Sequence, residues 1–291
     1  MATGFKTRNG ALGVDTDKRP LRRVTDAARA AGLAAGLVTT VPLSHATPAA
    51  FGVHAQERNR YADLARQLID NEALSVLMGC GHPGFDANGR PRALVKGYDY
   101  VGGAETWAAL ERGEAGRRDT GSVPAWRLVQ DRAGFLALAT GVPPARVVGV
   151  APVAKTLQQE RAPSRDWNGD GTISFADAAA APAYGDPATP GMPTLAEMAE
   201  AALAVLRPAP RGFFLMIEGG AVDWGGHQNQ TGRMIEELLD FHDAVQAVCG
   251  WVERHGGWDR TLLQVTADHE TGFLQGRAAA GSDATCPPVE A

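Results

Sequence analysis

Residues 212–227, GFFLMIEGGAVDWGGH, place a continuous apolar run directly before a group of glycines and polar side chains. The run over 212–217 is short and apolar throughout, which is typical of a strand buried on both faces of a sheet. Glu218, Asp223 and His227 follow it, and carboxylates and imidazoles are the side chains that bind zinc or magnesium. Because glycines let a backbone approach a ligand closely, the stretch predicts a buried strand that ends at a polar site.

The rest of the chain alternates similar apolar runs with segments of helical periodicity. We expect strands over residues 34–40, 74–78, 146–153, 212–217 and 261–266. We expect helices over residues 20–31, 48–69, 132–140, 195–206 and 234–252. Strands that alternate with helices indicate a mostly parallel central sheet with helices on both faces. The predicted fold class is therefore α/β.

Composition excludes several classes of partner. At 291 residues, with 44% hydrophobic and 21% charged residues, the chain is typical of an ordinary globular protein. The net charge of −5 combines both signs along the sequence, so we expect no nucleic-acid partner. No uninterrupted apolar run is long enough to span a bilayer, so we expect no membrane partner either. Residues 1–7 lack the apolar core of a signal peptide.

Two further strand ends carry polar residues of the same kinds. The last predicted strand is followed by Asp268 and His269, and the first predicted strand is followed by His45 and Thr47. In open parallel sheets, ligands bind beyond the carboxyl ends of the strands. Three strand ends with metal-binding side chains at one edge of a sheet therefore predict a single shared metal site.

Each of these groups also has a purely structural interpretation. Asp223 and His227, four residues apart, would make a surface pair at the start of a helix. Asp268 with His269 would make a charged turn. A threonine before Pro48 would cap a helix, with the proline at its first position. Only the combination of the three strand ends favours the metal site.

Arg58 is the predicted phosphate ligand. It lies eleven residues beyond Thr47, which is about three helical turns along the same face. A guanidinium aimed at the metal site would hold two oxygens of a phosphate group bidentately. Without the neighbouring metal-binding residues, a solvated helix arginine would be the preferred interpretation.

Residues 161–193 are rich in proline, aspartate, glycine and alanine, and we interpret them as a loop insertion. Within it, residues 166–177, DWNGDGTISFAD, fit the twelve-residue calcium loop of an EF-hand. The expected calcium ligands are Asp166, Asn168, Asp170, Thr172, Ser174 and Asp177. Aspartate replaces the usual glutamate at the twelfth position, so we expect a weaker site that holds the insertion in place. The alternative is a solvated acidic loop.

Taken together, four segments resemble the alkaline phosphatase family in order and in spacing, over residues 2 to about 275. The segments are ATGFKTRNGALGVD (2–15), SHATPAAFGVHAQERN (44–59), FFLMIEGGAVDWGGH (213–227) and VTADHETG (265–272). The resemblance implies one alkaline-phosphatase-like domain over residues 1–291, built as a three-layer sandwich. It also implies hydrolysis of small phosphate monoesters at a site with two zinc ions and one magnesium ion, through a phosphoserine intermediate.

The same resemblance implies a role for each residue of the predicted site. It assigns Asp223 and His227 to the first zinc, Asp268 and His269 to the second zinc, Thr47 and Glu218 to the magnesium, His45 to a place near the magnesium, and Arg58 to the substrate phosphate. The positions of His45 and Trp224 vary within the family, so we expect both residues to tune metal preference and rate.

This chain also departs from the family pattern. The nucleophilic serine and a bridging aspartate are expected upstream of Ala2, and the last zinc-binding histidine well beyond the DHETG motif. We therefore expect a fold that is incomplete at both termini, with each metal site one protein ligand short. Two alternatives stay open: an inactive remnant that binds phosphate or calcium, and a related phosphodiesterase or sulfatase. The resemblance also implies a periplasmic or secreted protein and a homodimer.

Overall fold

A five-stranded sheet in which every pairing is parallel forms the centre of the molecule. The computed structural model describes residues 1–116 and 123–271, and Gly272 of the DHETG motif lies outside these residues. In spatial order the strands are β3 (Arg127–Val129), β4 (Val147–Val150), β2 (Leu74–Cys80), β1 (Ala34–Pro42) and β5 (Phe213–Glu218). The predicted α/β class is confirmed.

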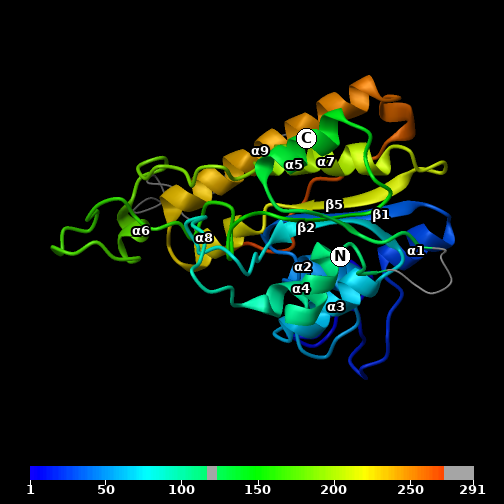
Figure 1. Cartoon of the computed structure of the whole chain (residues 1–291), viewed down its shortest axis with the longest axis horizontal. Coiled ribbons are helices and arrows are strands. Elements are labelled where there is room, and N and C mark those ends of the chain that lie inside the picture. The colour runs from blue at the N-terminus through cyan, green and yellow to red at the C-terminus, as the bar shows by residue number, and fades with distance from the viewer. Residues whose placement is uncertain (117–122, 272–291) are drawn as a thin grey trace, which may run out of the picture.

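Helices cover both faces of this sheet. In chain order they are α1 (Val24–Ala30), α2 (Ala46–Gly52), α3 (Tyr61–Asp70), α4 (Ala104–Glu111), α5 (Arg132–Thr140), α6 (Asp177–Ala180), α7 (Leu195–Leu206), α8 (Ala221–His227) and α9 (Thr231–Arg254), with short 3₁₀ helices η1 (Tyr98–Val101) and η2 (Trp258–Arg260). Helices α5, α7 and α9 lie above the sheet in Figure 1, and α2, α3 and α4 lie below it. Within the described ranges, no helix is both long and apolar enough to cross a bilayer.

Alternate side chains of the strands fill two apolar cores. Leu37 and Leu77 belong to the core that includes Leu64 and Leu68 of α3. Their neighbours in β1 and β2, including Val38, belong to the core on the α7 side of the sheet. Successive side chains of a strand point to opposite faces, so a sheet covered on both sides needs strands that are apolar at every position. This is why four of the predicted apolar runs correspond to strands β1, β2, β4 and β5.

The single helix predicted over residues 48–69 is wrong, because the chain leaves the helix after Gly52. Val53 is extended (φ −134°, ψ 170°), and residues 53–60 run as a loop between α2 and α3. The loop backbone bonds to the N-terminal segment: Ala55 and Leu12 exchange two N–H···O bonds of 2.8 and 2.9 Å. These bonds to a distant segment replace the hydrogen bonds that would continue the helix.

The strand predicted over residues 261–266 is also wrong. This segment joins no sheet in the described part of the chain, where β5 pairs only with β1 and forms an edge. Leu262 is 90% exposed, whereas Leu263 packs against the core between α7 and α9. A strand needs a hydrogen-bonded neighbour, and local sequence does not reveal whether one is present.

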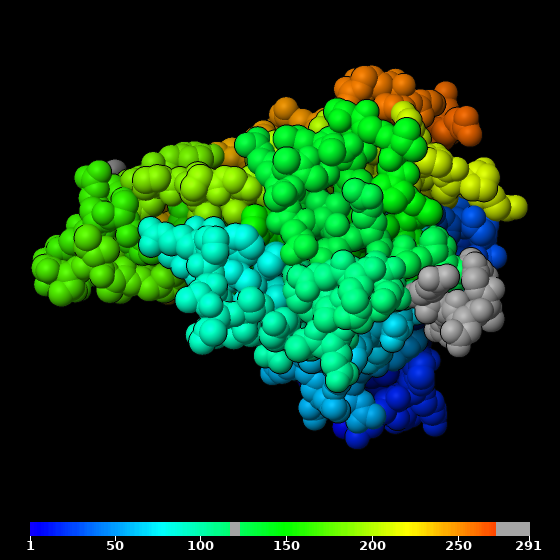
Figure 2. Space-filling model, in the orientation of Figure 1, coloured from blue at the N-terminus to red at the C-terminus, as the bar shows by residue number. Residues whose placement is uncertain are grey.

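Buried ion pairs join the predicted insertion, residues 161–193, to the start of α9. Arg233 and Asp186 approach to 2.5 Å with side chains 1% and 0% exposed, and Arg161 contacts Glu236 at 2.7 Å. Figure 2 shows this part of the chain as a protrusion at one end of the molecule, although its base is anchored by these pairs. Removing one partner of a buried pair leaves an uncompensated charge, so both partners are needed to hold the insertion.

Glu237, the next residue along α9, is a buried carboxyl group beside these pairs. Burial, with a further contribution from the charge of Asp240, raises the pKa of Glu237 to about 8, although Arg161 acts in the opposite direction. The side chain is therefore protonated at neutral pH. An unfolded chain would release this proton near pH 4.5, so the stability of the fold falls as the pH rises between these two values.

We expect Glu237→Gln to remove this pH dependence, because the amide keeps the shape of the protonated acid. Between pH 5 and pH 7.5, the free energy of unfolding of Glu237→Gln should rise relative to that of the parent by about 1.4 kcal/mol per pH unit. Urea unfolding at several pH values measures this difference. Glu253→Gln, at an exposed position of α9, is the matched control. A constant difference across the range would show that Glu237 is ionised in the folded chain.

Candidate metal centre

Two buried threonines at the end of β1 connect this strand to β5 and α8. Thr39 lies opposite Glu218 in the parallel register, and its hydroxyl donates to Oε2 of Glu218 at 2.5 Å. The hydroxyl oxygen of Thr40 accepts a 3.1 Å bond from the backbone N–H of Ala221, the first residue of α8. The two threonines are 0% and 1% exposed. They therefore fix both the Glu218 carboxylate and the start of the helix that follows it.

Glu218 lies among other carboxylates. Burial raises the pKa of Glu218, hydroxyl groups of Thr39 and Thr47 lower it, and the charges of Asp268 and Asp223 raise it. Three predicted metal ligands from two distant segments are thus close enough to repel one another. A divalent cation between them would offset this repulsion, so the charge distribution at this edge fits a metal site.

Asp223 and His227 lie one turn apart on α8. Nε2 of His227 is 3.5 Å from Oδ1 of Asp223, and the two side chains are 70% and 35% exposed. The hydroxyl of Thr271 donates to the same carboxylate oxygen of Asp223. This contact ties the segment that contains the DHETG motif to α8, so both predicted zinc pairs lie at the same end of the sheet.

Asp268 and His269 lie on the segment after η2, which has no regular structure. Nε2 of His269 is 3.6 Å from Oδ2 of Asp268, and both side chains are more than half exposed. The ring N–H at Nδ1 of His269 donates to the carbonyl oxygen of Glu270 at 2.8 Å. This bond, followed by the charge of Asp268, raises the pKa of His269. The pair is open to solvent and accessible to an ion.

The capping role considered for Thr47 is wrong. Helix α2 begins at Ala46 with His45 as its N-cap, so Thr47 lies inside the first turn. The Thr47 hydroxyl instead bonds to the Glu218 carboxylate. Burial, together with the nearby charge of Arg58, lowers the pKa of His45 to about 4. The imidazole of His45 is therefore uncharged at neutral pH.

Arg58 reaches the site from a loop and not from a helix face. Its backbone N–H donates to the carbonyl of Gly10 at 2.7 Å, which anchors the loop to the N-terminal segment. The guanidinium is close enough to His45 to act on its charge. The predicted location of Arg58 near the metal-binding residues therefore agrees with the structure, although the helical spacing used to predict it does not.

The predicted ligands form pairs and not complete ligand sets. Within residues 1–116 and 123–271, no group of three or more His, Cys, Asp or Glu side chains has the arrangement of a metal site. Catalytic zinc is normally bound by three protein ligands, so each Asp–His pair is one ligand short of that number. The donor types still fit: nitrogen and oxygen for zinc in the two Asp–His pairs, and oxygen alone for magnesium at Glu218 and Thr47.

The predicted calcium loop is closed on itself by its first and last carboxylates. Oδ1 of Asp166 accepts from the N–H of Gly169 at 2.6 Å. The buried Asp177 carboxylate accepts from the N–H groups of Trp167 and Ser174, at 2.7 and 2.8 Å. The other expected ligands, Asn168, Asp170, Thr172 and Ser174, are exposed. The segment is thus a loop held together by its own carboxylates, and calcium binding there stays a prediction.

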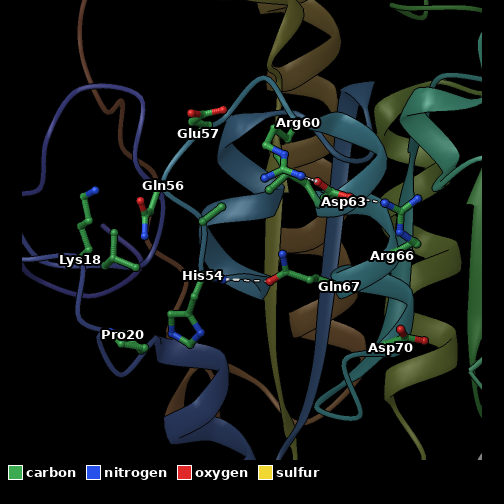
Figure 3. Close-up of a pocket in the computed structure, with 13 residues that line it drawn as sticks. Lys18, Pro20, His54, Gln56, Glu57, Arg60, Asp63, Arg66, Gln67 and Asp70 are labelled. Atoms are coloured by element: carbon green, nitrogen blue, oxygen red, sulfur yellow. Dashed lines mark hydrogen bonds and ion pairs between the residues drawn. The ribbon is translucent and has the colours of Figure 1, made fainter.

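A separate hollow of about 790 Å³ lies beside α3 and does not include the predicted ligands. Figure 3 shows Arg60 and Arg66 on either side of Asp63, and both guanidinium groups pair with this carboxylate. His54 also lines the hollow, with Nε2 bonded to the carbonyl of Leu21 at 2.9 Å. Several charged groups of the hollow already have partners within it. The hollow is therefore a weaker candidate for a ligand-binding site than the polar residues at the strand ends.

Three supporting residues were missed by the sequence analysis: Thr39, Thr40 and Thr271. Thr39 and Thr40 did carry a signal, because they are polar residues at the end of an otherwise apolar strand that precedes a predicted site. Thr271 carried none, since its contact with Asp223 joins segments 48 residues apart.

Comparison with known proteins identifies the family. The chain is 30% identical to alkaline phosphatase 4 of Bacillus subtilis over 283 residues, which cover 94% of this chain and 48% of that protein. It is 34% identical to streptomycin-6-phosphate phosphatase of Streptomyces griseus over 287 residues, which cover 92% and 59%. The crystal structure of Thermus thermophilus alkaline phosphatase matches the fold with a TM-score of 0.60 and 26% identity, over 87% of this chain and 43% of that one.

The chain thus spans about half the length of the curated relatives that it matches. The match nevertheless extends along nearly all of the chain, including the described strands and both Asp–His pairs. The family model for alkaline phosphatase covers residues 1–287. The chain therefore belongs to the alkaline phosphatase family.

Proposed function

We propose that this chain binds the metals and the phosphate group for metal-dependent hydrolysis of phosphate monoesters. One observation carries the proposal: the Glu218 carboxylate at the end of β5 lies within electrostatic range of both Asp223 and Asp268. Membership of the alkaline phosphatase family supports it, because enzymes of this family are metal-dependent and act on phosphate monoesters.

The donor sets assign one metal to each pair of ligands. Asp223 and His227 would hold one zinc, Asp268 and His269 a second zinc, and Glu218 with Thr47 the magnesium, beside His45. When bound, such divalent ions stabilise the charge that develops on the entering and leaving oxygens of phosphoryl transfer. The uncharged imidazole of His45 adds no competing positive charge at this position.

The remaining roles of this chain's residues are to bind the substrate phosphate and to orient the proposed metal ligands. The Arg58 guanidinium binds two phosphate oxygens and neutralises part of their charge. Thr39 holds the Glu218 carboxylate, and Thr271 holds Asp223, so two of the metal ligands are oriented by a second hydrogen bond. The phosphoserine of the family mechanism requires a serine that the resemblance does not match to any residue of this chain.

A calcium ion in residues 166–177 is the second part of the proposal. The EF-hand pattern supports it, as does the closed loop formed around Asp166 and Asp177. The indole N–H of Trp167 donates to Asp186 at 2.9 Å, and Asp186 pairs with Arg233 of α9. A calcium ion in the loop would therefore hold the insertion in the position that these buried pairs define.

Family membership also supports a proposal for the location, the assembly and the substrates of the protein. We propose export to the periplasm or the medium, with assembly as a homodimer, and small phosphate monoesters as the substrates. Cell fractionation and analytical ultracentrifugation test the first two of these points. Relative rates on a phosphate monoester, a phosphate diester and a sulfate ester test the third.

We expect Asp223→Asn to weaken zinc binding by at least about tenfold, because the amide is a poorer ligand than the carboxylate. Competition with a fluorescent zinc chelator measures the dissociation constant. Asp243→Asn, an exposed carboxylate on α9, is the matched control and should bind zinc as the parent does. Equal zinc affinity in Asp223→Asn and the parent would remove Asp223 from the site.

Arg58→Met should weaken the binding of inorganic phosphate, with zinc and magnesium present, by roughly tenfold to a hundredfold. The change removes a charge-assisted bidentate contact and leaves the volume of the side chain similar. Isothermal titration calorimetry gives the affinity. Arg60→Met removes a nearby guanidinium that already pairs with Asp63 at 2.5 Å, and it should have little effect. Similar losses in both variants would point to a general charge effect.

Calcium should raise the free energy of unfolding of the chain, by about 2.7 kcal/mol at a concentration one hundred times the dissociation constant. Asp166→Asn should abolish this increase, because it removes the first carboxylate of the loop. Thermal unfolding with and without calcium measures the effect, and Asp259→Asn, an exposed aspartate in η2, is the matched control. An unchanged calcium response in Asp166→Asn would assign the effect to another site.

A further inference from the structure

Four aromatic rings form a continuous row beside the proposed metal site. The ring centroids of Trp224 and His45 are 5.1 Å apart in an edge-on arrangement. His45 and Tyr61 are stacked at 6.1 Å, and Tyr61 lies 4.9 Å from Tyr100. The rings come from α8, the N-cap of α2, the first residue of α3, and η1. All three separations fall in the range at which aromatic rings attract one another.

Core packing does not account for both ends of this row. Tyr61 packs against the core below the sheet. Trp224 and Tyr100 belong to none of the apolar clusters formed by the described residues, although both are half-buried. Burial, followed by the influence of Tyr61, raises the pKa of Tyr100 to about 12, so its phenol stays neutral. The row therefore includes aromatic rings at both ends that the apolar cores do not use.

One end of the row consists of residues next to the proposed metal and phosphate ligands. Trp224 directly follows Asp223 on α8, and His45 lies two residues before Thr47. The His45 ring is within electrostatic range of both Arg58 and Asp223. A phosphate held by Arg58 and the metal ligands would thus have the rest of the ester beside these rings.

We propose that Trp224, His45, Tyr61 and Tyr100 receive the leaving group of the ester, so that this site favours phosphate monoesters with a flat aromatic leaving group. The inference rests on the proposed function, because it takes the phosphate position from it. A planar ring can stack on this row or meet it edge-on, whereas a saturated ring of equal size offers no aromatic face. Such pairs favour the aromatic ligand by roughly threefold to tenfold.

Binding of phenylphosphonate and cyclohexylphosphonate, with zinc and magnesium present, tests the proposal. At a pH above the second ionisation of both phosphonic acids, the two probes have the same charge and the same number of carbon atoms. Their carbon–phosphorus bonds resist hydrolysis, so the readout does not depend on turnover. Inorganic phosphate serves as the reference ligand. We expect calorimetry to give a dissociation constant roughly threefold to tenfold lower for phenylphosphonate than for cyclohexylphosphonate.

Variants at the end of the row beside Asp223 assign this preference to the aromatic rings, because one phenyl ring cannot extend from the phosphate to Tyr100 at the far end. Trp224→Leu, which keeps an apolar side chain in place, should abolish the preference, measured as the ratio of the two phosphonate dissociation constants. Trp224→Phe should retain it. Tyr184→Leu is the matched control, because Tyr184 is 67% exposed in the insertion and lies outside the row.

The outcomes separate this inference from the function on which it rests. Equal binding of the two phosphonates, each displaced by inorganic phosphate, would overturn the proposed role of the aromatic row. The proposed phosphate site would still be supported by that result. An aromatic preference that Trp224→Leu retains would also overturn the role of the row. Absence of binding by phosphate and by both phosphonates would overturn the proposed function, and this inference with it.

Discussion

The parallel pairing of β1 with β5 is the contact on which the rest of the site depends. It joins segments about 180 residues apart and sets Thr39 opposite Glu218, where the two side chains share a 2.5 Å hydrogen bond. Each strand then continues into a helix at the same end of the sheet, so α2 and α8 begin side by side. A shift of one residue in this register would turn Glu218 to the opposite face of the sheet.

Side-chain contacts at the insertion and just before it form a second set of long-range interactions near α8. Arg233 of α9 pairs with Asp186 of the insertion in a fully buried contact. Nε2 of Gln159 donates to the side-chain oxygens of Gln228 and Gln230, at 3.1 and 2.7 Å, directly after His227. The residue two positions before the insertion therefore contacts the residues directly after α8, while the insertion itself is held to α9.

His45 and Trp224, at two positions that the resemblance describes as variable within the family, lie in contact with each other. Tyr61 and Tyr100 extend this contact into a row that no core packing requires as a whole. The proposed phosphate site rests on the resemblance to the family, whereas the proposed leaving-group site rests on the ring contacts of these four side chains.

The sequence by itself determined four of the strands and the polar residues that follow two of them, because both signals are local: apolar runs of strand length, and side chains of metal-binding types directly after them. The motif that predicts a calcium loop is equally local, and calcium binding stays a prediction. Tertiary structure alone decided that residues 53–60 leave the helix, that 261–266 form no strand, and that Thr47 bonds to Glu218 and does not cap α2. Each of these outcomes depends on a hydrogen-bonding partner from a distant segment, and the periodicity of a single stretch of chain contains no information about such a partner.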